Sequence, residues 1–276
     1  MHIEFTKMHG LGNDFIVFDA PTSAAVPSSA QFRQLSARHT GVGFDQALLI
    51  EPPRRPDSVA FYRIFNADGG EVEQCGNGAR CVAALLRRTG RAPAGDVVMD
   101  SPAGLIRARI QDDGLVAVDM GVPDFAPASL PFAAVAEAEE YSLEVAGERV
   151  NFSAVSLGNP HAVIVVPAVA TAPDARIGAA LEQHEAFPKR VNVGFMEIVA
   201  PQHIRLRVFE RGVGETLACG TGACAAVAVG HRRGRLALQV RVQVPGGELS
   251  VSWPGPGQNI WLTGPAEVAF QGSAEI

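Results

Sequence analysis

The amino-acid sequence predicts an α+β protein made of two similar halves, and three observations lead to this fold class. The chain has 276 residues, of which 47% are apolar, so it can bury one large core or two cores of ordinary size. It contains an internal sequence repeat whose two copies each span about half the chain. Each half combines several short strand-like segments with one segment of helical composition, which is typical of an α+β domain.

The repeat is clearest around two cysteines, Cys75 and Cys219, which are 144 positions apart. The tripeptide Leu-Gly-Asn also recurs, at 11–13 and 157–159, and Val-Gly-Phe recurs at 42–44 and 193–195. Because these matches keep the same order, we interpret the two halves as homologous. The identical pairs at the offset of 144 are Phe65/Phe209, Gly70/Gly214, Glu71/Glu215, Gly76/Gly220, Gly78/Gly222, Ala79/Ala223, Arg88/Arg232, Gly90/Gly234 and Arg91/Arg235.

The same elements are expected in the same order in each half. Short apolar and alternating runs predict strands, and an Ala/Leu/Val/Arg segment after each cysteine predicts a helix that ends before a glycine. In the first half we expect strands at 3–5, 15–18, 60–65, 105–110 and 115–119 and a helix at 79–89. In the second half we expect a helix at 223–233 and strands at 237–244 and 249–253.

Proline-rich and glycine-rich stretches suggest where the domains end. Residues 121–131 are rich in proline and alanine, and residues 254–257 read Pro-Gly-Pro-Gly. We therefore expect a first domain of residues 1–122, to which residues 265–276 return, and a second domain of residues 123–264.

Composition excludes several classes of protein. The formal net charge of −6 argues against a nucleic-acid-binding surface. No run approaches the roughly 18 apolar residues of a membrane helix. The first ten residues mix charged and apolar types, unlike a signal peptide. We therefore expect a cytoplasmic protein with no nucleic-acid or membrane partner, whose four cysteines are thiols.

Cofactor and metal chemistry have little support in the sequence. The gaps between Cys75 and Cys81 and between Cys219 and Cys224 differ from the spacing of zinc ligands, so we expect no metal. Only two of the 23 basic residues are lysines, at positions 7 and 189, which limits the anchors for a Schiff-base cofactor such as pyridoxal phosphate. We expect no cofactor.

Cys75 and Cys219 each stand in the pattern Cys-Gly-x-Gly-Ala, directly before a predicted helix. The start of a helix carries N–H groups without intrahelical partners and a partial positive charge, which lower a thiol pKa and attract a carboxylate. For a lone cysteine a small buried residue in a tight turn would be the favoured interpretation, but the duplication favours a functional pair. We expect Cys81 and Cys224, at unmatched positions, to be structural.

Two such thiols on opposite sides of one carbon could invert a stereocentre, one removing a proton as thiolate and the other delivering a proton as thiol. The surrounding motifs are the segments 7–15, 65–80, 158–161 and 210–223. Over nearly the whole chain they resemble diaminopimelate epimerases. The resemblance implies two α+β domains related by a pseudo-twofold axis, each a barrel-like sheet around a central helix, in a homodimer.

The resemblance also implies a cofactor-independent epimerase that interconverts LL-2,6-diaminopimelate and meso-2,6-diaminopimelate, a small amino-acid substrate, in lysine and peptidoglycan biosynthesis. It assigns Cys75 and Cys219 as the catalytic base and acid, with His161 and Glu210 adjusting their protonation. The implied substrate-binding residues are Asn13, Gln46, Asn66, Gly76, Asn77, Asn159, Asn192, Glu210, Arg211, Gly220 and Thr221.

Residue types alone leave alternatives open. Asn13 and Asn159 follow glycine and could form turns, His161 could be a core histidine, and Glu210 with Arg211 could be a structural ion pair. Gln46, Asn66 and Asn192 are singled out by the resemblance only. For the whole chain, the alternatives are another two-cysteine racemase of the same fold, such as one acting on proline, or a thiol redox protein.

Overall fold

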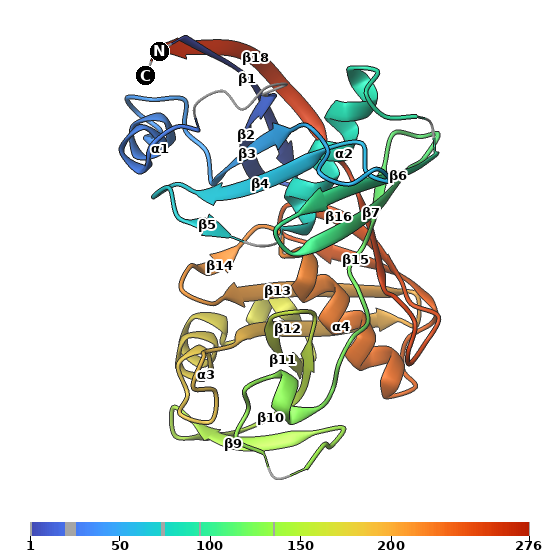
Figure 1. Cartoon of the computed structure of the whole chain (residues 1–276). Helices are drawn as coiled ribbons and strands as arrows, with labels where there is room; N and C mark the ends of the chain where they lie inside the picture. The colour runs from blue at the N-terminus through green and yellow to red at the C-terminus, as the bar shows by residue number, and fades with distance from the viewer. Residues whose placement is uncertain (1, 20–25, 73–74, 94, 135, 276) are drawn as a thin grey trace. The chain divides into compact units, whose positions relative to one another are not determined.

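The computed structural model describes residues 2–19, 26–72, 75–93, 95–134 and 136–275, and the chain forms two compact units (Figure 1). Unit 1 consists of residues 1–119 and 263–276, and unit 2 of residues 120–262. Strands dominate both units and helices are few, which confirms the predicted two-domain α+β class. The exact domain limits inferred from sequence, after residues 122 and 264, stay a prediction.

In unit 1 the strand order is β18-β1-β2-β3-β4-β6-β7-β8. The pairs β2–β3 and β4–β6 are parallel and the others antiparallel, and β5 forms a hairpin on β4. The strands are β1 (His2–Gly10), β2 (Asn13–Asp19), β3 (Gln46–Glu51), β4 (Phe61–Asn66), β5 (Glu71–Val72), β6 (Gly95–Ser101), β7 (Gly104–Ile110), β8 (Val116–Asp119) and β18 (Glu267–Glu275).

Unit 2 follows the same plan, with the order β9-β10-β11-β12-β13-β15-β16. Here β11–β12 and β13–β15 are parallel, and β14 forms a hairpin on β13. The strands are β9 (Tyr141–Val145), β10 (Glu148–Ser156), β11 (Pro160–Val165), β12 (Asn192–Ala200), β13 (His203–Glu210), β14 (Gly214–Thr216), β15 (Gln239–Val244), β16 (Gly247–Ser252) and β17 (Trp261–Gly264), which contains the limit between the units.

One long helix lies in each unit, α2 (Gly76–Arg88) and α4 (Gly220–Arg232). Ten of the thirteen residues of each helix are buried, so each is enclosed on most of its circumference. Both end before a glycine with positive φ, Gly90 (74°) and Gly234 (65°), as predicted. The shorter helices are α1 (Ser29–Ser36), η1 (Pro127–Ser129), η2 (Val169–Thr171), η3 (Asp174–Gly178) and α3 (Ala179–Glu182).

Strand β2 shows why its sequence is a continuous apolar run, since it is buried on both faces. A side chain at Gly78 would lie 3.5 Å from the Phe15 ring, so this face of β2 packs against the start of α2. On the other face, Ile16 and Phe18 belong to a core cluster with Phe32 of α1. Among the described residues no helix is long and apolar enough to cross a membrane.

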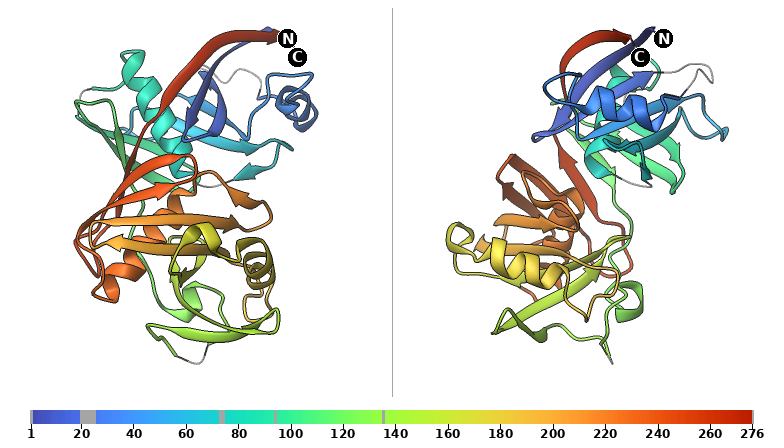
Figure 2. Two further views of the ribbon diagram at one scale, coloured as in Figure 1. Left: turned by 180° about the vertical axis from the view of Figure 1, so that it is seen from behind. Right: turned by 90° about the vertical axis from the view of Figure 1, so that its left-hand side faces the viewer.

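Strands β1 and β18, from opposite ends of the sequence, lie side by side in unit 1, and the two termini are next to each other (Figures 1 and 2). Their antiparallel register runs from His2 opposite Glu275 to His9 opposite Glu267. The other neighbour of β1 is β2, so β1 is an interior strand. The C-terminal strand β18 is therefore part of the unit 1 sheet.

Candidate active site

Cys75 is the N-cap residue of α2, and its sulfur accepts a hydrogen bond from the Gly78 N–H at 3.4 Å. The helix start lies tightly against the sheet, because a side chain at Gly78 would approach Leu48 of β3 to 3.0 Å. A side chain at this position would therefore have to displace the Leu48 side chain slightly. The thiol is partly exposed and stands at the positive end of a thirteen-residue helix.

Asn13 joins the start of β2 to the start of α2. Its Oδ1 lies 4.0 Å from the Cys75 sulfur and accepts a hydrogen bond from Asn77 Nδ2 at 3.1 Å. Its Nδ2 donates to Asp45 at 2.9 Å. Asn77 is in turn held by Arg80, a fully buried arginine that donates to Asn77 Oδ1 at 2.9 Å. Three predicted site residues of unit 1 are thus in contact.

Gln46 and Asn66 form a second pair in unit 1. They are opposite each other in the antiparallel β3–β4 ladder, and Gln46 Nε2 donates to Asn66 Oδ1 at 3.0 Å. Gln46 is also opposite Phe15 in the parallel β2–β3 ladder, two residues from Asn13. The polar side chains of unit 1 that the sequence singled out, apart from Cys75, are therefore neutral amides.

Cys219 is the N-cap residue of α4, at the position in unit 2 that corresponds to Cys75. Its sulfur lies 3.6 Å from Thr221 Oγ1 and is buried. A side chain at Gly222 would approach Val208 to 2.9 Å and the Cys219 sulfur to 3.3 Å, so Val208 would have to move to admit it. The two cysteine turns are built alike, but Cys219 is the less accessible thiol.

Asn159 and His161 continue the network from Thr221. Asn159 Nδ2 donates to Thr221 Oγ1 at 3.3 Å, and Asn159 Oδ1 lies 3.0 Å from Nε2 of the buried His161. Burial, followed by the positive charge of Arg211, lowers the pKa of His161 to about 3. His161 is therefore neutral at physiological pH, and a neutral imidazole can donate or accept one hydrogen bond at each nitrogen.

Asn192 connects the strand of His161 to the turn that carries Arg211. Asn192 faces His161 in the parallel β11–β12 ladder, and its Oδ1 accepts the backbone N–H of Arg211 at 2.9 Å. The guanidinium of Arg211 donates to the carbonyl of Lys189 at 3.0 Å and is otherwise exposed enough to meet a ligand. Before it in sequence, half-buried Glu210 accepts from Thr216 Oγ1 at 2.5 Å.

The protonation of Cys219 differs from the sequence expectation. The helix start was expected to lower the thiol pKa, and hydrogen bonds from Thr221 and Gly222 do act in that direction. Burial and the negative charge of Glu210 outweigh them and raise the pKa of Cys219 well above its usual value. Cys219 consequently carries its proton at neutral pH.

In each unit, an Arg–Glu ion pair at an equivalent position stabilises the hairpin that precedes the cysteine. Arg63 holds Glu71 through two hydrogen bonds of 2.7 Å, and Arg207 holds Glu215 through two of 2.5 and 2.9 Å. Arg63 and Arg207 are 144 positions apart, and so are Glu71 and Glu215, which is the offset of the repeat. The bidentate geometry fixes β5 on β4 and β14 on β13.

Sequence reasoning missed three residues that support the site, Asp45, Arg80 and Thr216. Arg80 directly follows the Cys-Gly-x-Gly-Ala pattern, and its position before the apolar run 81–86 was the available signal. Asp45 and Thr216 gave no such signal, because each reaches its partner only through the folded sheet.

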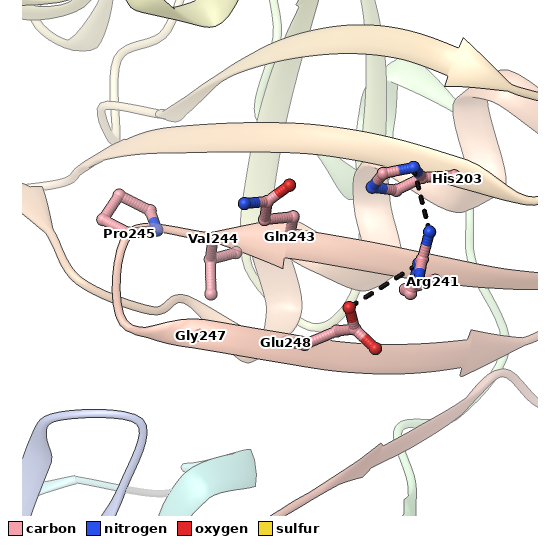
Figure 3. A pocket seen from close by; sticks show the side chains of 7 residues that line it. All are labelled: His203, Arg241, Gln243, Val244, Pro245, Gly247 and Glu248. Atoms are coloured by element: carbon pink, nitrogen blue, oxygen red, sulfur yellow. Dashed lines mark hydrogen bonds and ion pairs between the residues drawn. The ribbon is translucent and has the colours of Figure 1, made fainter.

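A pocket of unit 2 lies outside this set of residues (Figure 3). It is lined along β13, β15 and β16 by His203, Arg241, Gln243, Val244, Pro245, Gly247 and Glu248. Arg241 donates to His203 at 3.2 Å and lies 3.6 Å from Glu248, so its charge is shared within the pocket. None of the predicted site residues lines it.

Comparison with known proteins places these residues in a family context. A sequence model described as diaminopimelate epimerase matches residues 5–126 and 153–269. Proteins named diaminopimelate epimerase from Azoarcus sp. (strain BH72) and Alkalilimnicola ehrlichii are 53% and 52% identical, over the full length of both chains in each case.

Solved structures share the fold at low sequence identity. A hydroxyproline epimerase from Agrobacterium vitis matches with a TM-score of 0.70 at 19% identity, over 99% of this chain and 92% of that one. A methylitaconate-delta-isomerase matches with a TM-score of 0.67 at 15% identity, over 99% and 95%. At such identities the match concerns the fold alone.

Proposed function

Because the chain belongs to the diaminopimelate epimerase family, we propose that it interconverts LL-2,6-diaminopimelate and meso-2,6-diaminopimelate with Cys75 and Cys219 as a two-base pair and without a cofactor. One observation carries the mechanism. Two similarly built units each place one cysteine at the N-cap of a thirteen-residue helix, 144 positions apart.

In the proposed reaction one cysteine, as thiolate, takes the α proton, and the C–H electron pair moves toward the α carboxylate. The other cysteine, as thiol, gives its proton to the opposite face of the same carbon and becomes the thiolate. Each turnover exchanges their roles, so both sulfurs must reach one carbon. N–H groups at Gly76, Asn77, Gly220 and Thr221 would stabilise the charge that develops on the carboxylate.

The protonation of Cys219 supports a starting assignment. Burial and Glu210 raise its pKa, so Cys219 enters the cycle as the proton donor. Turnover then requires Cys75 to be the first base. His161, whose lowered pKa keeps it neutral, adds no charge that would stabilise a Cys219 thiolate.

The distal amino-acid group of the substrate would be bound by the remaining polar residues. Arg211 can hold a carboxylate through two parallel hydrogen bonds, and Glu210 can accept hydrogen bonds from an ammonium group. The amide residues offer both donors and acceptors. This amide set comprises Asn13, Gln46, Asn66, Asn159 and Asn192.

Deuterium exchange tests the proposal. In D₂O the enzyme should incorporate deuterium at the α carbon of LL-diaminopimelate while meso-diaminopimelate forms. With L-proline it should neither exchange the α proton nor form D-proline. Exchange into proline alone would identify a different racemase of the same fold. Absence of exchange into any amino acid, with reversible oxidation of the thiols, would instead indicate a thiol redox protein.

The biological setting belongs to the same proposal. The product meso-diaminopimelate would serve lysine and peptidoglycan biosynthesis in the cytoplasm, and the enzyme would act as a homodimer. Phe270 of β18 is half exposed and packs edge-on against Phe5, so it can contribute apolar surface to a dimer contact. Sedimentation equilibrium should give twice the chain mass, and Phe270→Asp should reduce it; a monomeric mass for the unaltered chain would contradict the dimer.

A further inference from the structure

Glu182 is a buried carboxylate for which the proposed mechanism has no use. It is the last residue of α3, and its side chain is only 3% exposed. Burying a carboxylate is unfavourable unless hydrogen bonds or an opposite charge compensate for the lost hydration. The partners of Glu182 therefore indicate what the carboxylate does.

One oxygen of Glu182 binds the turn that carries Arg211. Glu182 Oε1 accepts the backbone N–H of Gly212 at 3.0 Å and a longer hydrogen bond from Arg190 Nη1 at 3.4 Å. Gly212 directly follows Arg211 and has a φ of 74°, a conformation that favours glycine. The buried carboxylate thus fixes the backbone on the C-terminal side of Arg211.

The segment that follows Glu182 also holds the side chain of Arg211. The Lys189 carbonyl accepts from the Arg211 guanidinium at 3.0 Å. The next residue, Arg190, has a φ of 60°, which a non-glycine residue adopts only where its surroundings hold it. Val191 donates back to the Glu182 carbonyl at 3.2 Å, which closes this segment on the end of α3.

The corresponding turn in unit 1 offers a comparison. Ser36 is the last residue of α1, 146 positions before Glu182, and its hydroxyl donates to the Ala67 carbonyl at 3.2 Å. Ala67 lies 144 positions before Arg211. Arg33 of the same helix donates to the next carbonyl, that of Asp68, at 3.1 Å, so two side chains of α1 hold this turn by its carbonyls. In unit 2, where the turn carries Arg211, a buried carboxylate accepts from a backbone N–H of the turn.

We propose that Glu182 is a positioning residue that, through the Gly212 N–H, sets the Arg211 guanidinium to bind the distal carboxylate of the substrate. The inference rests on the proposed function of Arg211. Glu182 itself does not contact the substrate. Its removal should therefore weaken substrate binding, which raises KM, and should leave the proton-transfer steps and kcat nearly unchanged.

A double-mutant cycle tests this role. The variants Glu182→Gln, Glu182→Ala, Arg211→Met and the double variant Glu182→Ala/Arg211→Met are assayed with LL-diaminopimelate, after circular dichroism has confirmed folding. Glu182→Ala should raise KM about tenfold with kcat within about twofold. In the Arg211→Met background the same substitution should change kcat/KM less than about twofold. Glu182→Gln keeps an acceptor for Gly212 and should recover part of the loss.

The control is Glu148→Ala, which removes a carboxylate paired with Arg176 at 2.6 Å on the exposed edge of unit 2 and should leave KM unchanged. An equal loss of kcat/KM from Glu182→Ala in both backgrounds would overturn the inference, as would unchanged kinetics in both Glu182 variants. If Arg211→Met alone leaves KM unchanged while both cysteines remain essential, the inference falls and the two-base proposal stands.

Discussion

The two units place their predicted site residues at equivalent points of one strand pattern, but several of these points carry side chains of different charge. In unit 1, Phe15 is opposite Gln46, and Gln46 is opposite Asn66. In unit 2, His161 is opposite Asn192. Val193, which follows Asn192, pairs with Phe209, so Glu210, which follows Phe209, takes the position that Asn66 has in unit 1. The equivalent pairs are Asn13/Asn159, Phe15/His161, Gln46/Asn192, Asn66/Glu210, Ala67/Arg211, Cys75/Cys219 and Asn77/Thr221.

This comparison separates the framework from the chemistry it carries. The strand pairings, the N-cap cysteines and the bidentate Arg–Glu pairs recur in both units, so they belong to the framework. The charged residues Glu210 and Arg211, and the titratable His161, occur in unit 2 only. Among the predicted site residues, the charged side chains therefore lie in unit 2, whereas unit 1 contributes amides.

The largest effect is expected where the units are most alike. Cys75→Ala and Cys219→Ala should each reduce epimerisation roughly 1,000-fold or more, because either substitution removes one of the two proton carriers. Epimerisation is measured by chiral chromatography of the products. Cys81→Ala and Cys224→Ala, which alter buried thiols in the same helices, are the controls and should retain turnover. A Cys219→Ala protein that still epimerised normally would contradict the two-base proposal.

The second effect tests the charge difference. Arg211→Met should raise KM for diaminopimelate about 100-fold, because a lost hydrogen bond to a charged group is worth about 1.5–3 kcal/mol. Initial rates across a range of substrate concentrations give the value. Arg205→Met removes an arginine of the same strand region that is paired with Glu197 at 2.9 Å, and KM should not change. Equal KM values for the two variants would count against a special role for Arg211.

The third effect concerns an ionic network that unit 2 lacks. Asp14 pairs with Lys7 and Arg38, whereas the equivalent residue in unit 2 is Pro160. Burial acts to raise the pKa of Asp14, but the hydrogen bonds and charges of Arg38 and Lys7 outweigh it and lower the pKa to about 2. This stabilisation is present above the unfolded-state pKa near 3.8 and is lost as the pH falls toward 2.

Asp14→Asn should therefore lower the free energy of unfolding by about 2 kcal/mol at pH 7. The difference between the variant and the unaltered protein should disappear near pH 2. Urea unfolding followed by circular dichroism at several pH values measures it. Asp96→Asn, at an exposed ion pair with Arg109, is the control. A destabilisation by Asp14→Asn that did not depend on pH would show that packing and not charge is responsible.

The smallest effect is a change in thiol titration. Glu210→Gln removes a negative charge that raises the pKa of Cys219, so this pKa should fall. The rate of alkylation by iodoacetamide against pH, measured in the Cys75→Ala background, reports it. Glu215→Gln is the control. It alters a carboxylate that is paired with Arg207 and should not change the pKa of Cys219. An unchanged pH dependence for Glu210→Gln would show that Glu210 does not affect the pKa of Cys219.

Local features of the fold were predictable from sequence. The cysteine caps and the glycines at 90 and 234 are signalled by adjacent residues, although each long helix begins three residues earlier than its composition indicates, at Gly76 and Gly220. The glycine-rich first turn masked these starts. The expected strands are found, but others were not predicted, among them β3, β6, β12 and β13, whose parallel pairings join segments distant in sequence.

Among the candidate site residues too, some are signalled by the local sequence and others become evident only in the folded chain. The repeat and the family motifs identify side chains such as Asn13 and Cys75, which the folded chain brings into contact. Whether they bind substrate stays a prediction. Glu182 reads as an ordinary helix residue in the sequence, and only its burial sets it apart. The raised pKa of Cys219 also depends on burial, a property of the assembled unit.

The pairing of β1 with β18 has a consequence for the order of folding during synthesis. Residues 2–10 leave the ribosome early, but their partner strand at 267–275 is made more than 250 residues later. At roughly 5–20 residues per second, tens of seconds pass between the two events. All of unit 2 is translated in that interval. Unit 1, which is encoded first, is thus completed last. Until β18 is made, one edge of β1 stays unpaired, whereas unit 2 can already fold.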